Sequence, residues 1–175
     1  MKETSEPSKS YDESTSKRNR FYSDYYSNHA SDLAMSDIEK QINLEAIYYQ
    51  NEILPLIPEN KKISILDIGC GYGSLLFTLK KAGYFNLTGI DISEEMVKIA
   101  HQLKMKEVIH GNLIPFLETN DQKYDLVTGI DIIEHFKRDE LLEILERLRK
   151  KLNPGGKVIF RTPNIDAPFG SSFSF

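Results

Sequence analysis

The stretch ILDIGCGYG, residues 65–73, joins an apolar run to three glycines at alternate positions. The overlapping run KISILDI (62–68) has the length and apolar character of a buried parallel strand. The glycines let the backbone turn sharply and let a ligand approach the main chain closely. A helix is predicted from Ser74 to Ala82, ended by Gly83, and its first amide groups would face the negative end of a ligand. This stretch therefore predicts a strand–turn–helix unit with a ligand crevice beyond the carboxyl end of the strand.

Strand and helix patterns alternate through the rest of the chain. Further strands are predicted at residues 86–91, 106–110 and 124–130. The tetrapeptide NPGG (153–156) is the predicted turn into a fifth strand, KVIFRT (157–162). This alternation predicts an α/β fold, a doubly wound and mostly parallel sheet with right-handed crossovers.

Helical spacing of apolar residues marks three more helices. Ser36 is the predicted cap of the first, which ends at Pro55 and Pro58. Ser93 is the predicted cap of the second, and the third runs from Asp139 to Leu152. The predicted apolar faces of the three helices are, in order, Ile38, Ile42, Ala46, Tyr49 and Ile53; Met96, Ile99, Ala100 and Leu103; and Leu141, Leu145, Leu148 and Leu152.

Composition indicates one domain preceded by two shorter segments. The chain has 175 residues, a length at which one hydrophobic core is expected. Residues 1–20 are rich in Ser, Thr, Lys and Glu and are predicted to be a disordered tail. Residues 21–60 are predicted to be a helical lid or cap segment, and residues 61–175 the ligand-binding domain.

Charge and cysteine content exclude several classes of protein. A net charge of −4 argues against a dedicated nucleic-acid surface. The single cysteine, Cys70, cannot form an intramolecular disulfide, so nothing indicates an oxidising compartment. No apolar run reaches the ~18 residues that a membrane helix needs. We therefore expect no membrane association and a cytoplasmic location.

Asp91 ends the predicted second strand, twenty residues after Gly71. An acid at this place can accept hydrogen bonds from both hydroxyls of a ribose. A simple cap for the next helix is the alternative reading of Asp91, but Ser93 already serves that purpose. The glycine turn and Asp91 together predict a bound nucleoside.

The glycine spacing separates two kinds of nucleoside site. A dinucleotide site would have the pattern G-x-G-x-x-G, whereas Ser74 stands where its third glycine would be. This disfavours an NAD-dependent oxidoreductase.

Four ordered motifs resemble those of the class I S-adenosylmethionine-dependent methyltransferases. They are ILDIGCGYG, GIDIS (89–93), YDLVTGIDIIEHF (124–136) and LNPGGKVIF (152–160), and the resemblance extends from about Ile63 to Asn164. It implies a Rossmann-like sheet with strand order 3-2-1-4-5-7-6, of which this chain supplies the first five strands, 3-2-1-4-5. A domain that is incomplete at its C-terminal end is therefore expected.

The resemblance also implies a cofactor, S-adenosyl-L-methionine, and a product, S-adenosyl-L-homocysteine. In the family, the glycine loop lines the methionyl and ribose parts and the acid at Asp91 holds the ribose. Asn112 stands where an acid commonly reaches the adenine, and an amide oxygen can accept the same hydrogen bond. The cofactor-binding residues implied are Asp67, Gly69, Cys70, Gly71, Tyr72, Gly73, Asp91, Ile92, Met96, Gly111, Asn112, Leu113 and Asp131.

The motif Asp131-Ile132-Ile133-Glu134-His135 is the candidate catalytic segment, which in the family lies nearest the transferable methyl group. Three roles are open for its polar residues. His135 is a candidate general base for a hydroxyl or amine acceptor, with Glu134 and Asp131 beside it. Glu134 and His135 are alternatively a structural pair that caps the next helix. Asp131, Glu134 and His135 also resemble the divalent metal ligands of certain O-methyltransferases.

The acceptor and partners are less directly indicated. The aromatic segment of Phe21, Tyr22, Tyr25, Tyr26 and His29 is either a helix packed on the sheet or a lid over the cofactor. TPN (162–164) and DAPFGS (166–171) resemble segments of methyltransferases that act in polysaccharide assembly, which implies a small-molecule acceptor such as a sugar or glycan precursor. A nucleoside-binding module without catalysis is the alternative. The open edge of the fifth strand predicts a homodimer.

Overall fold

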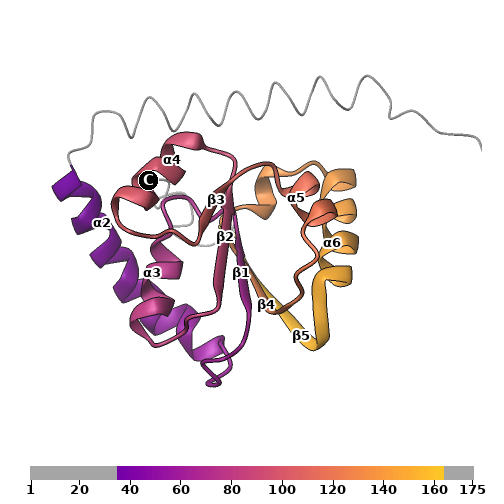
Figure 1. The fold of residues 1–175 in the computed structure, drawn as a ribbon, viewed down its shortest axis with the longest axis horizontal. Coiled ribbons are helices and arrows are strands. Elements are labelled where there is room, and N and C mark those ends of the chain that lie inside the picture. The colour runs from indigo at the N-terminus through magenta and orange to yellow at the C-terminus, as the bar shows by residue number, and fades with distance from the viewer. Residues whose placement is uncertain (1–34, 164–175) are drawn as a thin grey trace, which may run out of the picture.

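Five parallel strands form a single sheet in the computed structural model, which describes residues 35–163 (Figure 1). They are β1 (Ile65–Ile68), β2 (Leu87–Asp91), β3 (Val108–His110), β4 (Tyr124–Ile130) and β5 (Leu152–Arg161). Their order is β3-β2-β1-β4-β5, so the predicted α/β architecture and strand order are confirmed. The predicted tail, the aromatic segment 21–29 and residues 164–175 lie outside the described residues.

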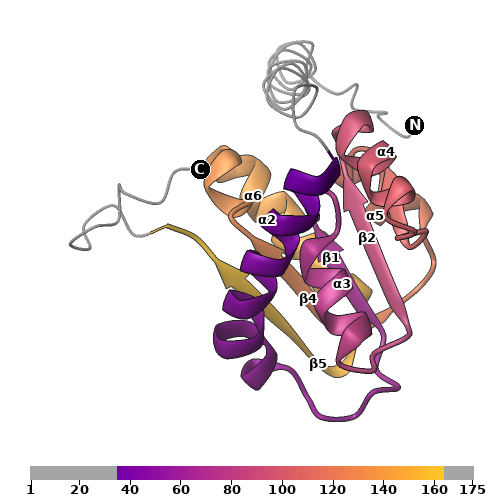
Figure 2. The same cartoon turned by 90° about the vertical axis from the view of Figure 1, so that its left-hand side faces the viewer.

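Helices cover both faces of the sheet. Figure 1 shows α2 (Met35–Tyr48), α3 (Ser74–Lys81) and α4 (Glu94–Gln102) on one side, and α5 (Leu113–Thr119) and α6 (Arg138–Lys151) on the other. In Figure 2, α2 and α3 lie in front of the sheet. None of the helices in residues 35–163 is both long and apolar enough to cross a membrane.

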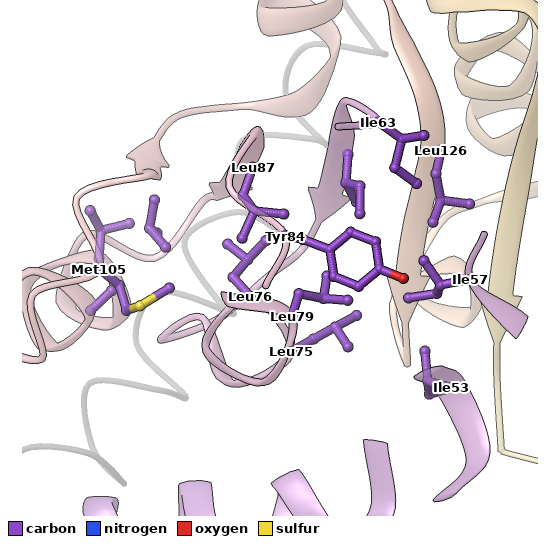
Figure 3. Packing of buried hydrophobic residues seen from close by; sticks show 14 residues of the cluster. Ile53, Ile57, Ile63, Leu75, Leu76, Leu79, Tyr84, Leu87, Met105 and Leu126 are labelled. Carbon is purple, nitrogen blue, oxygen red and sulfur yellow. The ribbon is translucent and has the colours of Figure 1, made fainter. Parts of the chain in front are cut away.

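The core beneath α3 is built around Tyr84. Figure 3 shows its ring among aliphatic side chains of α3 and of the segments that flank β1. The ring is 2% exposed, and its hydroxyl donates a 2.8 Å hydrogen bond to the carbonyl oxygen of Pro58. This bond satisfies a buried hydroxyl and fixes the chain segment that enters β1.

Several predicted strand boundaries are wrong, most clearly the starts of β1, β3 and β5. β3 begins at Val108, and β1 begins at Ile65, because the N–H of Ser64 donates to the Asp125 carboxylate instead of to a neighbouring strand. NPGG is part of β5, which starts at Leu152. The extra residues form an irregularity in the ladder: Leu152 lies opposite Tyr124, but Lys157 lies opposite Leu126.

The helices differ from prediction in their faces and ends. On α6, Leu148 is buried as predicted, but Ile144 is buried in place of Leu145, which is 38% exposed, because the helix packs against the sheet and α5. α2 already includes Ser36 in its first turn. It changes to a π-turn at Tyr49–Ile53, before Pro55 is reached. α5 was not predicted from the sequence, because it is short and contains a proline in its first turn.

Candidate active site

The glycine loop is anchored to the end of β2. The N–H groups of Gly69 and Cys70 both donate to the carbonyl oxygen of Ile90, at 2.9 and 3.2 Å. A Cβ on Gly69 would lie 2.6 Å from Cδ1 of Ile132, so only glycine lets this loop contact the loop after β4. A Cβ on Gly71 would have nothing within 4 Å, and its φ is +55°. The backbone at Gly71 therefore borders open space.

Asp91 joins this loop from β2. Its Oδ2 accepts a 2.7 Å hydrogen bond from the N–H of Gly71, and its Oδ1 accepts a 2.8 Å bond from the N–H of Ser93. Burial raises the pKa of Asp91, and the two backbone N–H groups oppose that rise. The N–H of Gly111 donates to the carbonyl oxygen of Asp91 at 2.8 Å, so the segment after β3 meets the same point. The structure thus brings together three parts of the predicted cofactor site.

Asp67 is buried within the sheet, with 3% of its surface exposed. Its Oδ1 accepts a 2.7 Å hydrogen bond from the hydroxyl of Thr128 on β4. Burial raises the pKa of Asp67 to about 7; the Thr128 hydroxyl opposes this rise and the charge of Asp91 adds to it. Asp67 therefore changes charge near neutral pH.

Two residues of the loop point away from its open side. The Cys70 sulfur packs against β2, 2.7 Å from where a Cβ on Gly89 would be, and burial raises the pKa of its thiol. The Tyr72 hydroxyl donates a 2.7 Å hydrogen bond to Oε1 of Glu45 on α2. Tyr72 also lines a cavity of about 400 Å³ between α2, α3 and the end of α4. Cys70 thus attaches the loop to β2, and Tyr72 attaches it to α2.

The residues predicted to contact the adenine lie in two places. Met96 packs against α2, and the others lie near β3 and the start of α5. Met96 is 8% exposed and packs with Ile38 and Ile42 of α2. Asn112 caps α5, because its Oδ1 accepts a 3.1 Å hydrogen bond from the N–H of Ile114. The carbonyl oxygen of Ile92 lies 3.1 Å from a ring nitrogen of His110, and Leu113 begins α5.

The polar residues after β4, for which the sequence leaves a metal-ligand role open, have partners on and after β5. No three His, Cys, Asp or Glu side chains within residues 35–163 gather as a group that could hold a metal ion. Asp131 instead pairs with Arg161, and Oε2 of Glu134 accepts a 3.2 Å hydrogen bond from the hydroxyl of Thr162. These partners on and after β5 hold the two carboxylates of the motif.

The sequence leaves a capping role open for Glu134 and His135. They lie in a 3₁₀ turn, Ile133–His135, ahead of α6. Glu140 caps α6 itself by accepting a hydrogen bond from the N–H of Lys137 at 3.1 Å.

Three residues near the site were not predicted from the sequence to have a role there. Tyr48 lies beneath the guanidinium of Arg161, whose central carbon is 4.9 Å from the ring centroid. Tyr49 is partly buried, and burial followed by the charges of Glu45 and Asp67 raises its pKa. Helical spacing marks Tyr49 only as a core residue. Arg161 could have been identified from the sequence because it is a charged residue directly after the apolar run VIF (158–160).

A family profile described as "Methyltransferase domain" matches residues 43–174. The chain belongs to this methyltransferase family. The predicted class I S-adenosylmethionine-dependent methyltransferase is therefore confirmed as the family, and the matched residues begin within α2.

Named relatives of this methyltransferase domain agree with the match. It is 39% identical over 111 residues to the ubiquinone biosynthesis O-methyltransferase of Hydrogenovibrio crunogenus, covering 61% of this chain and 44% of that protein. It is 28% identical over 133 residues to the mitochondrial enzyme of the same name from Dictyostelium discoideum, covering 65% and 41%. The chain thus spans less than half the length of these relatives.

A solved structure shares the fold of the domain. The crystal structure of a SAM-dependent methyltransferase from Archaeoglobus fulgidus superposes with a TM-score of 0.62 at 27% identity. The superposition covers 73% of this chain and 56% of that one.

Proposed function

We propose that this methyltransferase domain binds S-adenosyl-L-methionine in the crevice bordered by the glycine loop and Asp91, as the donor site of an O-methyltransferase. The observation that carries the proposal is the hydrogen bond between Gly71 and Asp91 beside open space at Gly71. This crevice lies beyond the carboxyl ends of β1 and β2, where open α/β sheets bind ligands.

The residues present fit a nucleoside donor. One oxygen of Asp91 accepts a hydrogen bond from the N–H of Gly71 and the other from the N–H of Ser93. A carboxylate oxygen can accept two hydrogen bonds, so both retain capacity for a ribose hydroxyl. The open space at Gly71 leaves room for a ligand against the main chain. The names of the Hydrogenovibrio and Dictyostelium relatives support a hydroxyl acceptor, and they give no support to the sugar or glycan precursor expected from the sequence.

S-adenosyl-L-methionine supplies a methyl group on a sulfonium centre, and the sulfur keeps the electrons of the broken bond as S-adenosyl-L-homocysteine forms. The chain's own contribution is to orient the reactants and exclude water, which can supply a large part of the rate. His135 is the proposed base that accepts the proton of the acceptor hydroxyl. Asp131 and Glu134 are held next to it by Arg161 and Thr162.

Calorimetric titration with S-adenosyl-L-homocysteine tests the donor site, with NADH as the control ligand. Binding of the former alone is expected, whereas binding of NADH alone would replace the proposal with a dinucleotide site. Methyl transfer to phenol or catechol, compared with aniline, then tests the hydroxyl acceptor. Donor binding without transfer to any acceptor would favour a non-catalytic module.

A further inference from the structure

Arg161 and Asp131 are joined twice, at the carboxyl ends of neighbouring strands. The N–H of Asp131 donates a 2.9 Å hydrogen bond to the carbonyl oxygen of Arg161. The guanidinium of Arg161 donates to Oδ2 of Asp131 in a salt bridge. Both the backbone and the carboxylate of Asp131 are therefore held by one residue of β5.

The backbone of Asp131 is in a conformation that needs such support. Its φ is +52°, in the left-handed region that non-glycine residues adopt only where their surroundings hold them. Strained residues of this kind gather at ligand sites. The conformation turns the chain sharply between β4 and the 3₁₀ turn at Ile133.

Arg161 is itself held by the N-terminal helix. Its guanidinium carbon lies 4.9 Å from the ring centroid of Tyr48, the last residue of α2, within the range of a cation–π contact. The end of α2, the loop after β4 and the end of β5 thus meet at one side chain. A planar guanidinium fixed by a ring and a carboxylate has little freedom left.

The other oxygen of Asp131 is buried in the loop that packs against the glycine loop. Oδ1 is buried and accepts no hydrogen bond from any residue between 35 and 163. The strand order reverses between β1 and β4, which is where open sheets place ligands, and Ile132 of the same loop packs against Gly69. Burial raises the pKa of Asp131 and the charge of Glu134 adds to the rise, while the charge of Arg161 opposes it.

We propose that Arg161 is a positioning residue for methyl transfer, which holds the Asp131 carboxylate beside the positive centre of the methyl donor. This inference rests on the proposed function. A charged carboxylate oxygen held in this way favours a cationic donor over the neutral sulfur of the product. Arg161 is expected to act only through Asp131.

Dissociation constants for two ligands, measured by calorimetry on the full chain, test the proposal. The ligands are S-adenosyl-L-homocysteine and sinefungin, an analogue with a charged amine in place of the methylated sulfonium. The unsubstituted chain is expected to prefer sinefungin. Arg161→Met and Asp131→Asn should each reduce that preference about tenfold, and the double substitution should match Asp131→Asn alone. Arg161→Lys should keep most of the preference, and Arg149→Met on the exposed side of α6 should leave it unchanged.

Three results would overturn the inference while leaving the donor site in place. One is an unchanged preference in Arg161→Met, even with a lower melting temperature, because Arg161 would then be only structural. Another is an increased preference for sinefungin in Arg161→Met, because the positive charge of Arg161 would then only weaken the attraction of Asp131 for a cationic ligand. The third is additive effects of the two substitutions. Failure of the unsubstituted chain to bind either ligand would instead overturn the proposed function.

Discussion

The N–H of Gly71 donates a 2.7 Å hydrogen bond to Oδ2 of Asp91, across twenty residues of sequence. This bond connects the first strand-to-helix turn to the end of the neighbouring strand, so the two halves of the proposed nucleoside site are held as one unit. The same carboxylate accepts a hydrogen bond from the N–H of Ser93, the residue that caps α4. Loss of this side chain would therefore alter both the ligand contact and the shape of the loop.

Asp91→Ala should weaken the binding of S-adenosyl-L-homocysteine more than tenfold. Two ribose hydroxyls would lose a charged acceptor, at about 1.5–3 kcal/mol for such hydrogen bonds, and the N–H of Gly71 would lose its partner. Titration calorimetry gives the dissociation constant. Asp121→Ala, at an exposed aspartate before β4, is the matched control and should bind normally. An unchanged constant for Asp91→Ala would remove Asp91 from the site.

Gly71→Val should abolish cofactor binding and leave the fold largely intact. The new side chain would enter the open space at the loop, where nothing lies within 4 Å of the added Cβ, and φ is +55°. Gly155→Val is the matched control: φ there is +79° with equally open space, but the residue lies in β5 away from the glycine loop. Circular dichroism checks folding and calorimetry checks binding. A folded Gly71→Val chain that still binds would contradict this placement.

Asp67→Asn should remove part of the pH dependence of stability. The pKa of Asp67 is about 7 in the folded chain against 3.8 in the unfolded chain, so the folded state holds an extra proton between these values. Stability from this group therefore falls as pH rises through that window. From pH 5 to pH 8 the free energy of unfolding of the unsubstituted chain should fall by about 2 to 3 kcal/mol more than that of Asp67→Asn. Urea unfolding at both pH values measures the difference, and parallel pH profiles would contradict it.

Tyr72→Phe should destabilise the chain by about 1 kcal/mol, because it removes the 2.7 Å hydrogen bond from the glycine loop to Glu45. Combined with Glu45→Ala, it should cost less than the sum of the two single substitutions. The urea midpoints of the four proteins give this coupling. Strict additivity would show that the bond contributes nothing to the attachment of α2.

Self-association through β5 is the expected consequence of its exposed edge. Among the described strands β5 pairs only with β4, and Val158 on it is 37% exposed. We expect dimers whose fraction rises with concentration in light scattering, since an edge strand offers unpaired ladder groups to a second copy. Val158→Lys should reduce the dimer fraction. A monomer at every concentration would defeat this expectation.

Local sequence patterns were sufficient to predict the order of the strands along the chain and part of the site. Apolar runs, caps and glycines predicted all five described strands, and β4 matched its predicted bounds of 124–130. Ser93 caps α4 as expected, by accepting a hydrogen bond from the N–H of Met96. These features depend on neighbours in sequence, so the chain itself specifies them.

The remaining features depend on contacts between distant segments, which only the tertiary structure decided. The hydrogen bond from Thr128 to Asp67 and the pairing of Arg161 with Asp131 each join residues that no local pattern connects. On α6, Leu148 is buried as predicted but Ile144 takes the place of Leu145, because the buried face of a helix is set by what it packs against. Asp131, Glu134 and His135 are close in sequence, but the partners of the two carboxylates, Arg161 at the end of β5 and Thr162 after it, are brought there by the pairing of β5 with β4. Sequence spacing determined which polar groups were near the crevice; the packing of strands against one another determined what each of them contacts.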